Sequence, residues 1–280
     1  MSTIPNPNVE TKTIPDVPVR SWSQFSLYMK CPQLFKYQYI DRVVPRKESI
    51  ALKIGNALHE GHEYLSGKKI ETGEVIEFKY LKSFVEKYWE ANPLKDSDSN
   101  LSEDLLEKNN ALRYMETYYN FFKANEITPK HTEKDVIWHP PGASFAIRGI
   151  IDRIDQENTL VDLKTTGKSP PKSRKTGNIY IPKQSGYDIQ LDIYAILMRE
   201  ALDIDVSGAY LEYVVKSKNC KVVKVKHEIR EDRLKSAMQL MENIEENIQK
   251  GVFTKNRLSQ YCGDYCSMWE QCTGIQTLEV

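Results

Sequence analysis

Apolar residues recur at helical spacing through the first part of the chain. This spacing predicts helices over residues 50–67, 74–91 and 101–125, the first of them ending in a glycine. Serines suited to N-capping open an earlier helical run over residues 21–43, and Pro32 inside that run predicts a kink or two short helices. The pattern therefore predicts a helical region that ends before about residue 128.

The apolar pattern changes after Pro129. Short alternating runs bounded by turn residues predict three successive strands, over residues 135–139, 144–154 and 158–166. A long loop rich in Gly, Pro and Ser follows, and loops of this length without regular structure are usually functional. The remaining pattern predicts a helix, a hairpin and a second helix, over residues 188–202, 206–229 and 230–250. This order indicates an α/β or α+β fold with one central sheet.

The composition is that of an ordinary globular protein. The 280 residues are 40% hydrophobic and 28% charged, which suffices for one large domain or two small ones. No run approaches the roughly 18 consecutive apolar residues of a membrane-spanning helix. Residues 1–20 are polar and proline-rich and lack the apolar centre of a secretory signal. We therefore expect a flexible segment over residues 1–20, no membrane association and a cytoplasmic location.

The charge is unevenly distributed, although it sums to zero. Six basic residues and no acidic ones lie from Lys164 to Lys183, and five lysines and no acidic residue lie from Lys216 to Lys226. Such runs are either solvated faces or rims that bind a polyanion such as the backbone of a nucleic acid. Zero net charge excludes an indiscriminate polycation and is compatible with a local basic groove.

Two aspartates stand on neighbouring predicted strands. Asp152 lies on the first strand and Asp162 on the next, and Lys164 follows two residues later on the same strand face as Asp162. Carboxylates held close together repel one another unless a cation lies between them, and Mg²⁺ takes carboxylate and phosphate oxygens as ligands. The three residues therefore suit metal-dependent cleavage of a phosphodiester. The alternative is that both aspartates are surface residues paired with Arg153 or Lys164.

Five cysteines raise the question of metal binding, because a chain without an export signal is not expected to form disulfides. Cys262, Cys266 and Cys272 are spaced C-x3-C-x5-C, and Cys31 is the candidate for the fourth ligand of a four-thiolate site. Zinc and an iron–sulfur cluster both suit four thiolates. Buried thiols without metal are the remaining alternative. Cys220 has no partner at a suitable spacing.

The stretch GIIDRID…LVDLKTT resembles the core signature of the PD-(D/E)xK nuclease superfamily, and specifically that of its RecB-like exonuclease branch. The resemblance places Asp152 and Asp162 at the two acidic positions and Lys164 at the motif lysine. Ile151 stands where the superfamily's proline would precede the first acid, a departure that is common in this branch.

Three further stretches carry the same resemblance. GNALHE is similar to a helix with a metal-ligand histidine, which assigns that role to His59, and DIQLDIYAILM is similar to a helix that presents Gln190 and Tyr194 to the site. SQFSLYMKCPQLFKYQY is similar to the segment that supplies the first cysteine of a 4Fe–4S cluster, although the late spacing in such families is usually C-x2-C-x5-C. From the residues alone, His59 could equally be structural and Gln190 could equally face solvent.

The resemblance implies an α/β fold with a restriction-endonuclease-like core. In such a core a central mixed sheet is flanked by helices, here with an N-terminal helical lobe and a C-terminal cysteine cluster added. Residues 21–280 would form a single RecB-like nuclease domain. Within it we expect the lobe, the catalytic core and a tail joined to Cys31 to occupy about residues 60–128, 129–250 and 251–280.

The resemblance also implies a metal-dependent DNA exonuclease of recombination, repair or phage DNA metabolism, acting on single strands or DNA ends. Lys164 would activate the attacking water, with Gln190 and Tyr194 beside it. Mg²⁺ or Mn²⁺ would be held by His59, Asp152, Asp162 and the Leu163 carbonyl. The DNA backbone would be gripped by Lys168, Lys172, Arg174, Lys175 and Lys183, and Tyr180 or Tyr187 would stack on bases.

Two other functions remain open. A nuclease-like scaffold can serve as a non-catalytic nucleic-acid-binding or assembly module, because fold does not fix function. A structure-specific endonuclease would use the same residues on a different substrate. The possible protein partners are equally open and include a helicase, an annealing protein and a CRISPR-adaptation complex.

Overall fold

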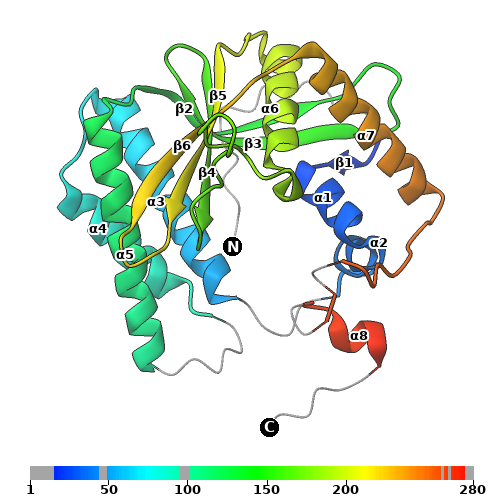
Figure 1. Cartoon of the computed structure of the whole chain (residues 1–280), viewed down its shortest axis with the longest axis horizontal. Coiled ribbons are helices and arrows are strands. Elements are labelled where there is room, and N and C mark those ends of the chain that lie inside the picture. The colour runs from blue at the N-terminus through cyan, green and yellow to red at the C-terminus, as the bar shows by residue number, and fades with distance from the viewer. Residues whose placement is uncertain (1–15, 44–48, 95–100, 260–261, 264–265, 275–280) are drawn as a thin grey trace.

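The computed structural model describes residues 16–43, 49–94, 101–259, 262–263 and 266–274. A six-stranded mixed sheet lies at its centre (Figure 1), in the order β1–β3–β4–β5–β6, with β2 paired to β3 outside this path. The strands are β1 (Val19–Arg20), β2 (Pro129–Trp138), β3 (Ala146–Asp155), β4 (Thr159–Thr166), β5 (Gly208–Val215) and β6 (Lys221–His227). Strands β2, β3 and β4 form an antiparallel meander, and β5 runs parallel to β4. The predicted α/β fold with a central mixed sheet is confirmed.

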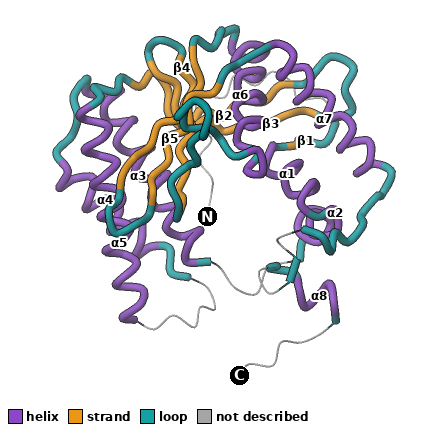
Figure 2. The backbone as a smooth tube through the Cα atoms, viewed as in Figure 1, coloured by secondary structure: helices purple, strands orange, loops and turns teal. Residues whose placement is uncertain are grey.

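Two groups of helices cover the two faces of this sheet (Figures 1 and 2). One face packs against α3 (Ile50–Thr72), α4 (Phe78–Ala91) and α5 (Leu101–Ala124), around a core that includes Leu163 and Val214 of the sheet. The other face packs against α1 (Trp22–Lys30), α6 (Tyr187–Leu202) and α7 (Glu231–Gln249). Because successive residues of a strand point to opposite faces, β4 buries Leu163 in the first core and Leu160 in the second.

The first helical run breaks at Pro32, as its sequence predicts. Ser21 begins α1 with a capping box to Gln24, and the helix ends at Lys30. Cys31 is extended, with φ −162° and ψ 108°, and Pro32 then opens the short helix α2 (Pro32–Phe35). A π-helical turn over Lys36–Ile40 follows. Proline suits the first position of a helix because its missing N–H would have no partner there.

Helix α3 is longer than its apolar pattern predicts. The expected end at Gly67 is wrong, because the helix continues to Thr72 and ends at Gly73, whose φ of 75° is the left-handed cap that glycine adopts readily. The boundary expected near residue 60 between the lobe and the rest of the chain therefore falls inside one continuous helix. As a result, His59 lies in the middle of α3.

The N-terminal strand joins the sheet, although residues 1–20 were expected to be flexible. Val19 and Arg20 pair in parallel with the beginning of β3. The Arg20 guanidinium makes two contacts of 2.6 and 2.9 Å with the Glu245 carboxylate of α7, which is almost fully buried. This bidentate ion pair fixes β1 in place. Residues 1–15 lie outside the described residues.

The segment after α7 packs against the first helices of the chain. The Tyr28 hydroxyl donates a hydrogen bond of 2.5 Å to the Val252 carbonyl, and the rings of Phe35 and Phe253 stack with their centroids 6.3 Å apart. A short helix, α8 (Trp269–Thr273), closes the described chain. Among the described residues, no helix is both long and apolar enough to span a lipid bilayer.

Candidate active site

Strands β3 and β4 separate at the two predicted aspartates. The strands pair at Arg153↔Val161 and Ile154↔Leu160, and Asp152 and Asp162 would be the next opposing pair. In place of a ladder bond there, Asp152 Oδ2 accepts a hydrogen bond of 2.7 Å from the backbone N–H of Leu163. The side chain thus satisfies a backbone donor that the separation would leave unpaired. The backbone pairing of β3 and β4 therefore ends where the two carboxylates stand.

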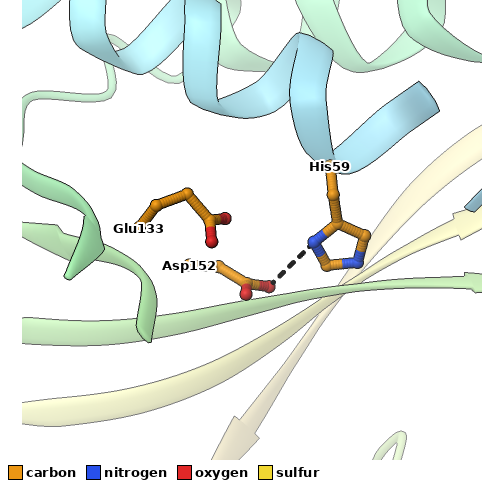
Figure 3. Close-up of side chains that lie close together, drawn as sticks. All are labelled: His59, Glu133 and Asp152. Atoms are coloured by element: carbon orange, nitrogen blue, oxygen red, sulfur yellow. Dashed lines mark ion pairs between the residues drawn. The ribbon is translucent and has the colours of Figure 1, made fainter. Parts of the chain in front are cut away.

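Asp152 lies within reach of two other ligand groups (Figure 3). His59 of α3 points at it, with Nδ1 3.5 Å from Asp152 Oδ2, and Glu133 of β2 approaches from the neighbouring strand. One ligand atom from each of the three residues lies within 4.8 Å of the others. An imidazole and two carboxylates gathered in this way form a plausible donor set for Mn²⁺ or Mg²⁺.

Glu133 was missed by the sequence analysis. It lies opposite Asp152 across β2 and β3, between the pairs Thr132↔Arg153 and Lys134↔Ile151, and its φ of 43° is unusual for a residue with a side chain. The strand was expected to begin at residue 135, which left Glu133 outside it. Counting back across the hairpin from Asp152 would have identified Glu133, because directly opposing residues share a face.

Asp162 and Lys164 form an ion pair on the other side of the gap. Lys164 Nζ lies 2.7 Å from Asp162 Oδ2, and Asp162 is fully buried. Burial raises the pKa of Asp162 to about 6, against the opposing effect of Lys164. Burial also opposes the charge of Lys164, yet the Asp162 and Asp152 carboxylates raise the pKa of that lysine. Lys164 is therefore a cation held beside the carboxylates.

These residues carry more negative charge than the surrounding protein neutralises. Burial, together with the Asp152 and Glu63 carboxylates, raises the pKa of Glu133 to about 8. Glu133 Oε1 is buried and has no hydrogen-bond partner among the described residues. A divalent cation would relieve both the repulsion and the missing contact, so the residues fit the metal that the sequence implies.

The expectation that both aspartates might be surface residues is wrong. Asp152 is 6% exposed and Asp162 is fully buried. Asp162 does pair with Lys164, but Arg153 points away from Asp152 to the opposite face of the sheet. There its guanidinium binds the Glu212 carboxylate at 2.9 Å and the Tyr118 hydroxyl at 2.6 Å.

Gln190 and Tyr194 lie one turn apart on α6, beside β3. The Gln190 side-chain amide donates a hydrogen bond of 2.9 Å to the Tyr194 hydroxyl. The Tyr194 ring packs so closely on Gly149 of β3 that a Cβ at Gly149 would lie 2.8 Å from it. Burial, with smaller effects from Asp162 and Asp152, raises the pKa of Tyr194 well above its usual range. Tyr194, and with it Gln190, therefore lies close enough to the two carboxylates for their negative charge to raise the pKa of the Tyr194 hydroxyl.

The predicted DNA-binding residues lie on the loop between β4 and α6. This loop folds back on itself through a bridge between Lys172 and Ile179. All five basic side chains are exposed, and within the described chain none of them makes an ion pair: Lys168, Lys172, Arg174, Lys175 and Lys183. Tyr180 is also exposed, whereas the Tyr187 ring centroid lies 5.1 Å from Lys164 Nζ. The loop thus offers unneutralised positive charge next to the site.

The four predicted cysteine ligands converge at the other end of the molecule. Cys31, Cys262, Cys266 and Cys272 line one cavity of about 340 Å³ between α2 and the tail. Burial, opposed by a backbone hydrogen bond and assisted by the other three cysteines, raises the pKa of the Cys266 thiol. Cys220 is not in this cavity. The four thiols therefore line one shared cavity, whereas the described residues that bring three ligand atoms within 4.8 Å of one another are His59, Glu133 and Asp152.

Comparisons with known proteins identify the family and the fold. A model of the PD-(D/E)XK nuclease superfamily matches residues 20–273. The chain is similar to the crystal structure of a proposed exonuclease from Eubacterium rectale, at 12% identity and a TM-score of 0.59, over 93% of this chain and 90% of that one. The crystal structure of SSO0001 matches over 87% of this chain and 96% of that one, at 13% identity, but its TM-score of 0.32 is too low to relate the folds. A search of curated proteins finds no significant match.

Proposed function

This chain belongs to the PD-(D/E)XK nuclease superfamily, and from that premise we propose that it is a divalent-metal-dependent DNA exonuclease of the RecB-like branch. It hydrolyses phosphodiester bonds in single strands or at DNA ends, in recombination, repair or phage DNA metabolism. One observation carries the proposal: strands β3 and β4 separate where they present Asp152 and Asp162, with His59, Glu133 and Lys164 around the gap.

The proposed ligand set is the one that the family resemblance implies, and its members His59 and Asp152 lie together with Glu133. His59, Asp152, Asp162 and the Leu163 carbonyl would hold Mg²⁺ or Mn²⁺, and Glu133 would join them directly or through water. The Leu163 N–H points toward Asp152, and the carbonyl of the same residue points to the same side of its strand. When bound, the divalent ion polarises the phosphate and lowers the pKa of water in the site.

The protein residues would orient the reactants. Lys164, kept protonated by Asp162, contacts the phosphate or the attacking water and stabilises the negative charge that develops. Gln190 and Tyr194 provide polar groups beside the same space. The exposed basic loop holds the backbone by displacing counterions, which predicts that binding weakens steeply as salt concentration rises.

We propose further that the four cysteines bind a 4Fe–4S cluster with a structural role. The shared cavity supports this assignment, and zinc is the competing occupant. Iron and acid-labile sulfide measured on anaerobically purified protein, beside zinc, distinguish the two. About four iron atoms per chain, lost in Cys266→Ser, is the expected result, because that thiol lies among the other three. Stoichiometric zinc without iron would refute the cluster.

The decisive experiment is a cleavage assay on end-labelled single- and double-stranded DNA and on circular single-stranded DNA. Anaerobically purified protein is tested with Mg²⁺, Mn²⁺ or EDTA, together with Asp162→Ala and the matched control Asp205→Ala, which removes an exposed carboxylate outside the site. We expect metal-dependent loss of terminal label, abolished by EDTA and by Asp162→Ala but retained in Asp205→Ala.

Other outcomes would redirect the assignment. Cleavage of circular DNA with the same metal and Asp162 dependence would indicate an endonuclease. Intact DNA in every lane, from folded wild-type protein that still binds DNA, would contradict a nuclease and favour the non-catalytic binding module.

A further inference from the structure

A second cavity lies on the basic-loop side of Lys164, outside the group of carboxylates. It measures about 310 Å³, and its lining includes Thr166, Lys168, Pro171, Ser185, Tyr187 and Tyr213. Tyr213 of β5 is the ladder neighbour of Lys164 on β4, so the two side chains lie on the same face of the sheet. The Tyr187 ring lies against the Lys164 ammonium group. Two residues that line the cavity therefore lie next to Lys164.

The Tyr213 hydroxyl in this wall has no hydrogen-bond partner among the described residues, although Tyr213 is only 4% exposed. Buried polar groups are almost always hydrogen-bonded, so an unpaired one calls for an explanation. Burial, with additional effects from Tyr187 and Asp162, raises the pKa of Tyr213, so its hydroxyl stays protonated and able to donate. An acceptor on a bound molecule would satisfy it.

The cavity wall is held in place before any ligand binds. The Ser185 hydroxyl accepts a hydrogen bond from the Tyr187 N–H at 3.3 Å and donates one to the Pro182 carbonyl at 2.6 Å. This arrangement fixes the residue that begins α6, and with it the base of the Tyr187 ring. The Tyr187 and Tyr213 rings then meet at an angle of 50°, with their centroids 6.3 Å apart.

The chemistry of the wall matches that of a nucleotide. Aromatic rings and prolines offer flat apolar surface to a base. Hydroxyl groups and the exposed Lys168 offer donors to a sugar and a phosphate. Ligand pockets usually measure about 300–1,000 Å³, so this one is at the small end of that range and suits one nucleotide better than a base pair.

We propose that this cavity is a subsite for one unpaired nucleotide next to the phosphodiester that Lys164 faces. The inference rests on the nuclease function proposed above and narrows its substrate class. The strand must be single at that position, so the substrates are single-stranded DNA and ends that fray or overhang. Blunt, tightly paired ends are then poor substrates.

The test compares single-stranded oligonucleotides that are intact or carry one abasic nucleotide on either side of the cleaved bond. KM and kcat are measured for the wild type, Tyr187→Ala and Tyr213→Phe. Tyr210→Phe is the control, because Tyr210 lies on the same strand but on its opposite face. Circular dichroism of each variant verifies folding.

Stacking and hydrogen bonding in the subsite predict how KM changes between the two kinds of strand and among the variants. An abasic nucleotide at one of the two positions should raise KM of the wild type about tenfold. Tyr187→Ala should raise KM about as much on the intact strand and add almost nothing on the abasic one, since both changes remove the same contact. Tyr213→Phe should raise KM severalfold, and Tyr210→Phe should leave KM unchanged.

Different results would contradict the proposed subsite and the proposed nuclease function. Equal KM on intact and abasic strands, or additive effects of Tyr187→Ala and the abasic change, would overturn the subsite while leaving the nuclease in place. Equal rates on blunt and overhanging duplexes would also overturn it. No cleavage of any strand by the wild type would overturn the proposed nuclease function, and the subsite with it.

Discussion

The carboxylate site and the cysteine site differ in what holds their ligands. Asp152, Glu133 and Asp162 stand on paired strands of the central sheet, whose backbone bonds fix them on both sides of the gap. Three of the four cysteines lie in the tail, where the described residues contain only one five-residue helix, and Cys262 is exposed. The first arrangement is set by the fold without metal. The proposed metal centre would supply much of the order of the second, as in small metal-stabilised domains.

The largest expected effect separates activity from stability at the carboxylate site. Lys164→Ala and Asp162→Asn should each lower kcat by about 10³-fold or more, because they remove charge placed for the transition state. The melting temperature of Asp162→Asn should stay within a few degrees of the wild type, whereas Lys164→Ala should lower it, because the buried Asp162 carboxylate loses its ion-pair partner. Steady-state kinetics and thermal unfolding measure the two quantities, with the exposed Lys235→Ala as the matched control for the loss of a lysine. Near-normal kcat in either variant would remove these residues from the mechanism.

The second-largest effect concerns the buried ion pair between Arg153 and Glu212, on the face of the sheet opposite to Asp152. Arg153 is fully buried, and burial opposes the ionisation of Glu212, yet Arg153 holds the pKa of Glu212 below its usual range. Arg153→Met should therefore lower the free energy of unfolding by about 3–5 kcal/mol, because the buried Glu212 carboxylate loses its guanidinium partner and keeps only the Tyr118 hydroxyl and, at 4.0 Å, the half-exposed Lys224. Urea unfolding measures the loss.

The matching double variant is Arg153→Met with Glu212→Leu. It should recover most of that stability, because no uncompensated charge remains. Equal stabilities of the single and double variants would mean that the uncompensated Glu212 charge is not what destabilises Arg153→Met.

At the cysteine site, the expected effect on stability is moderate and depends on metal. Cys266→Ser should lower the melting temperature by roughly 5–10 °C, because the bound centre ties residue 31 to the tail. EDTA, which strips Mg²⁺ or Mn²⁺ from the carboxylate site, should leave the melting temperature nearly unchanged. Calorimetry on anaerobic protein tests both, with Cys220→Ser as the control outside the cavity. A large drop in melting temperature with EDTA, and none in Cys266→Ser, would mean that the carboxylate site rather than the cysteine site needs metal for its order.

The smallest effect lies at the N-terminal end of α3, the helix that carries His59. Lys53 and Trp89 both contact the Asp104 carboxylate, at 3.0 and 3.1 Å. Burial opposes them, but these hydrogen bonds lower the pKa of Asp104 from its ordinary value of 3.8. A lowered carboxyl pKa contributes stability above the ordinary value, and this contribution disappears as pH falls through the lowered value.

Asp104→Asn should therefore cost about 0.5 kcal/mol at pH 7, since the carboxylate is partly exposed and screened by solvent. The difference from the wild type should disappear as pH falls through the lowered pKa of Asp104. Urea unfolding at a series of pH values measures it. If the stability difference between Asp104→Asn and the wild type grew as pH fell, the pKa of Asp104 would be raised rather than lowered by its contacts.

The sequence by itself determined most of the kinds of element and which candidate site residues lie close together. Helical spacing, strand alternation and Pro32 gave a correct order of helices and strands, because these signals act over a few neighbouring residues. The stretch from Gly149 to Thr166 placed Asp152, Asp162 and Lys164 together, since adjacent strands of a meander must pair. The cysteine spacing likewise singled out the four thiols that line one cavity.

Only the tertiary structure decided which groups from distant segments meet. Glu133 joins the site through the register of β2 against β3, and register depends on pairing along the whole hairpin rather than on local pattern. Helix α3 passes Gly67 and ends at Gly73, where the left-handed glycine cap forms. Tyr213 and Tyr187 share a cavity because a parallel strand and a helix converge beside Lys164. Such contacts are set by burial and chain crossing between distant residues, and no local spacing encodes them.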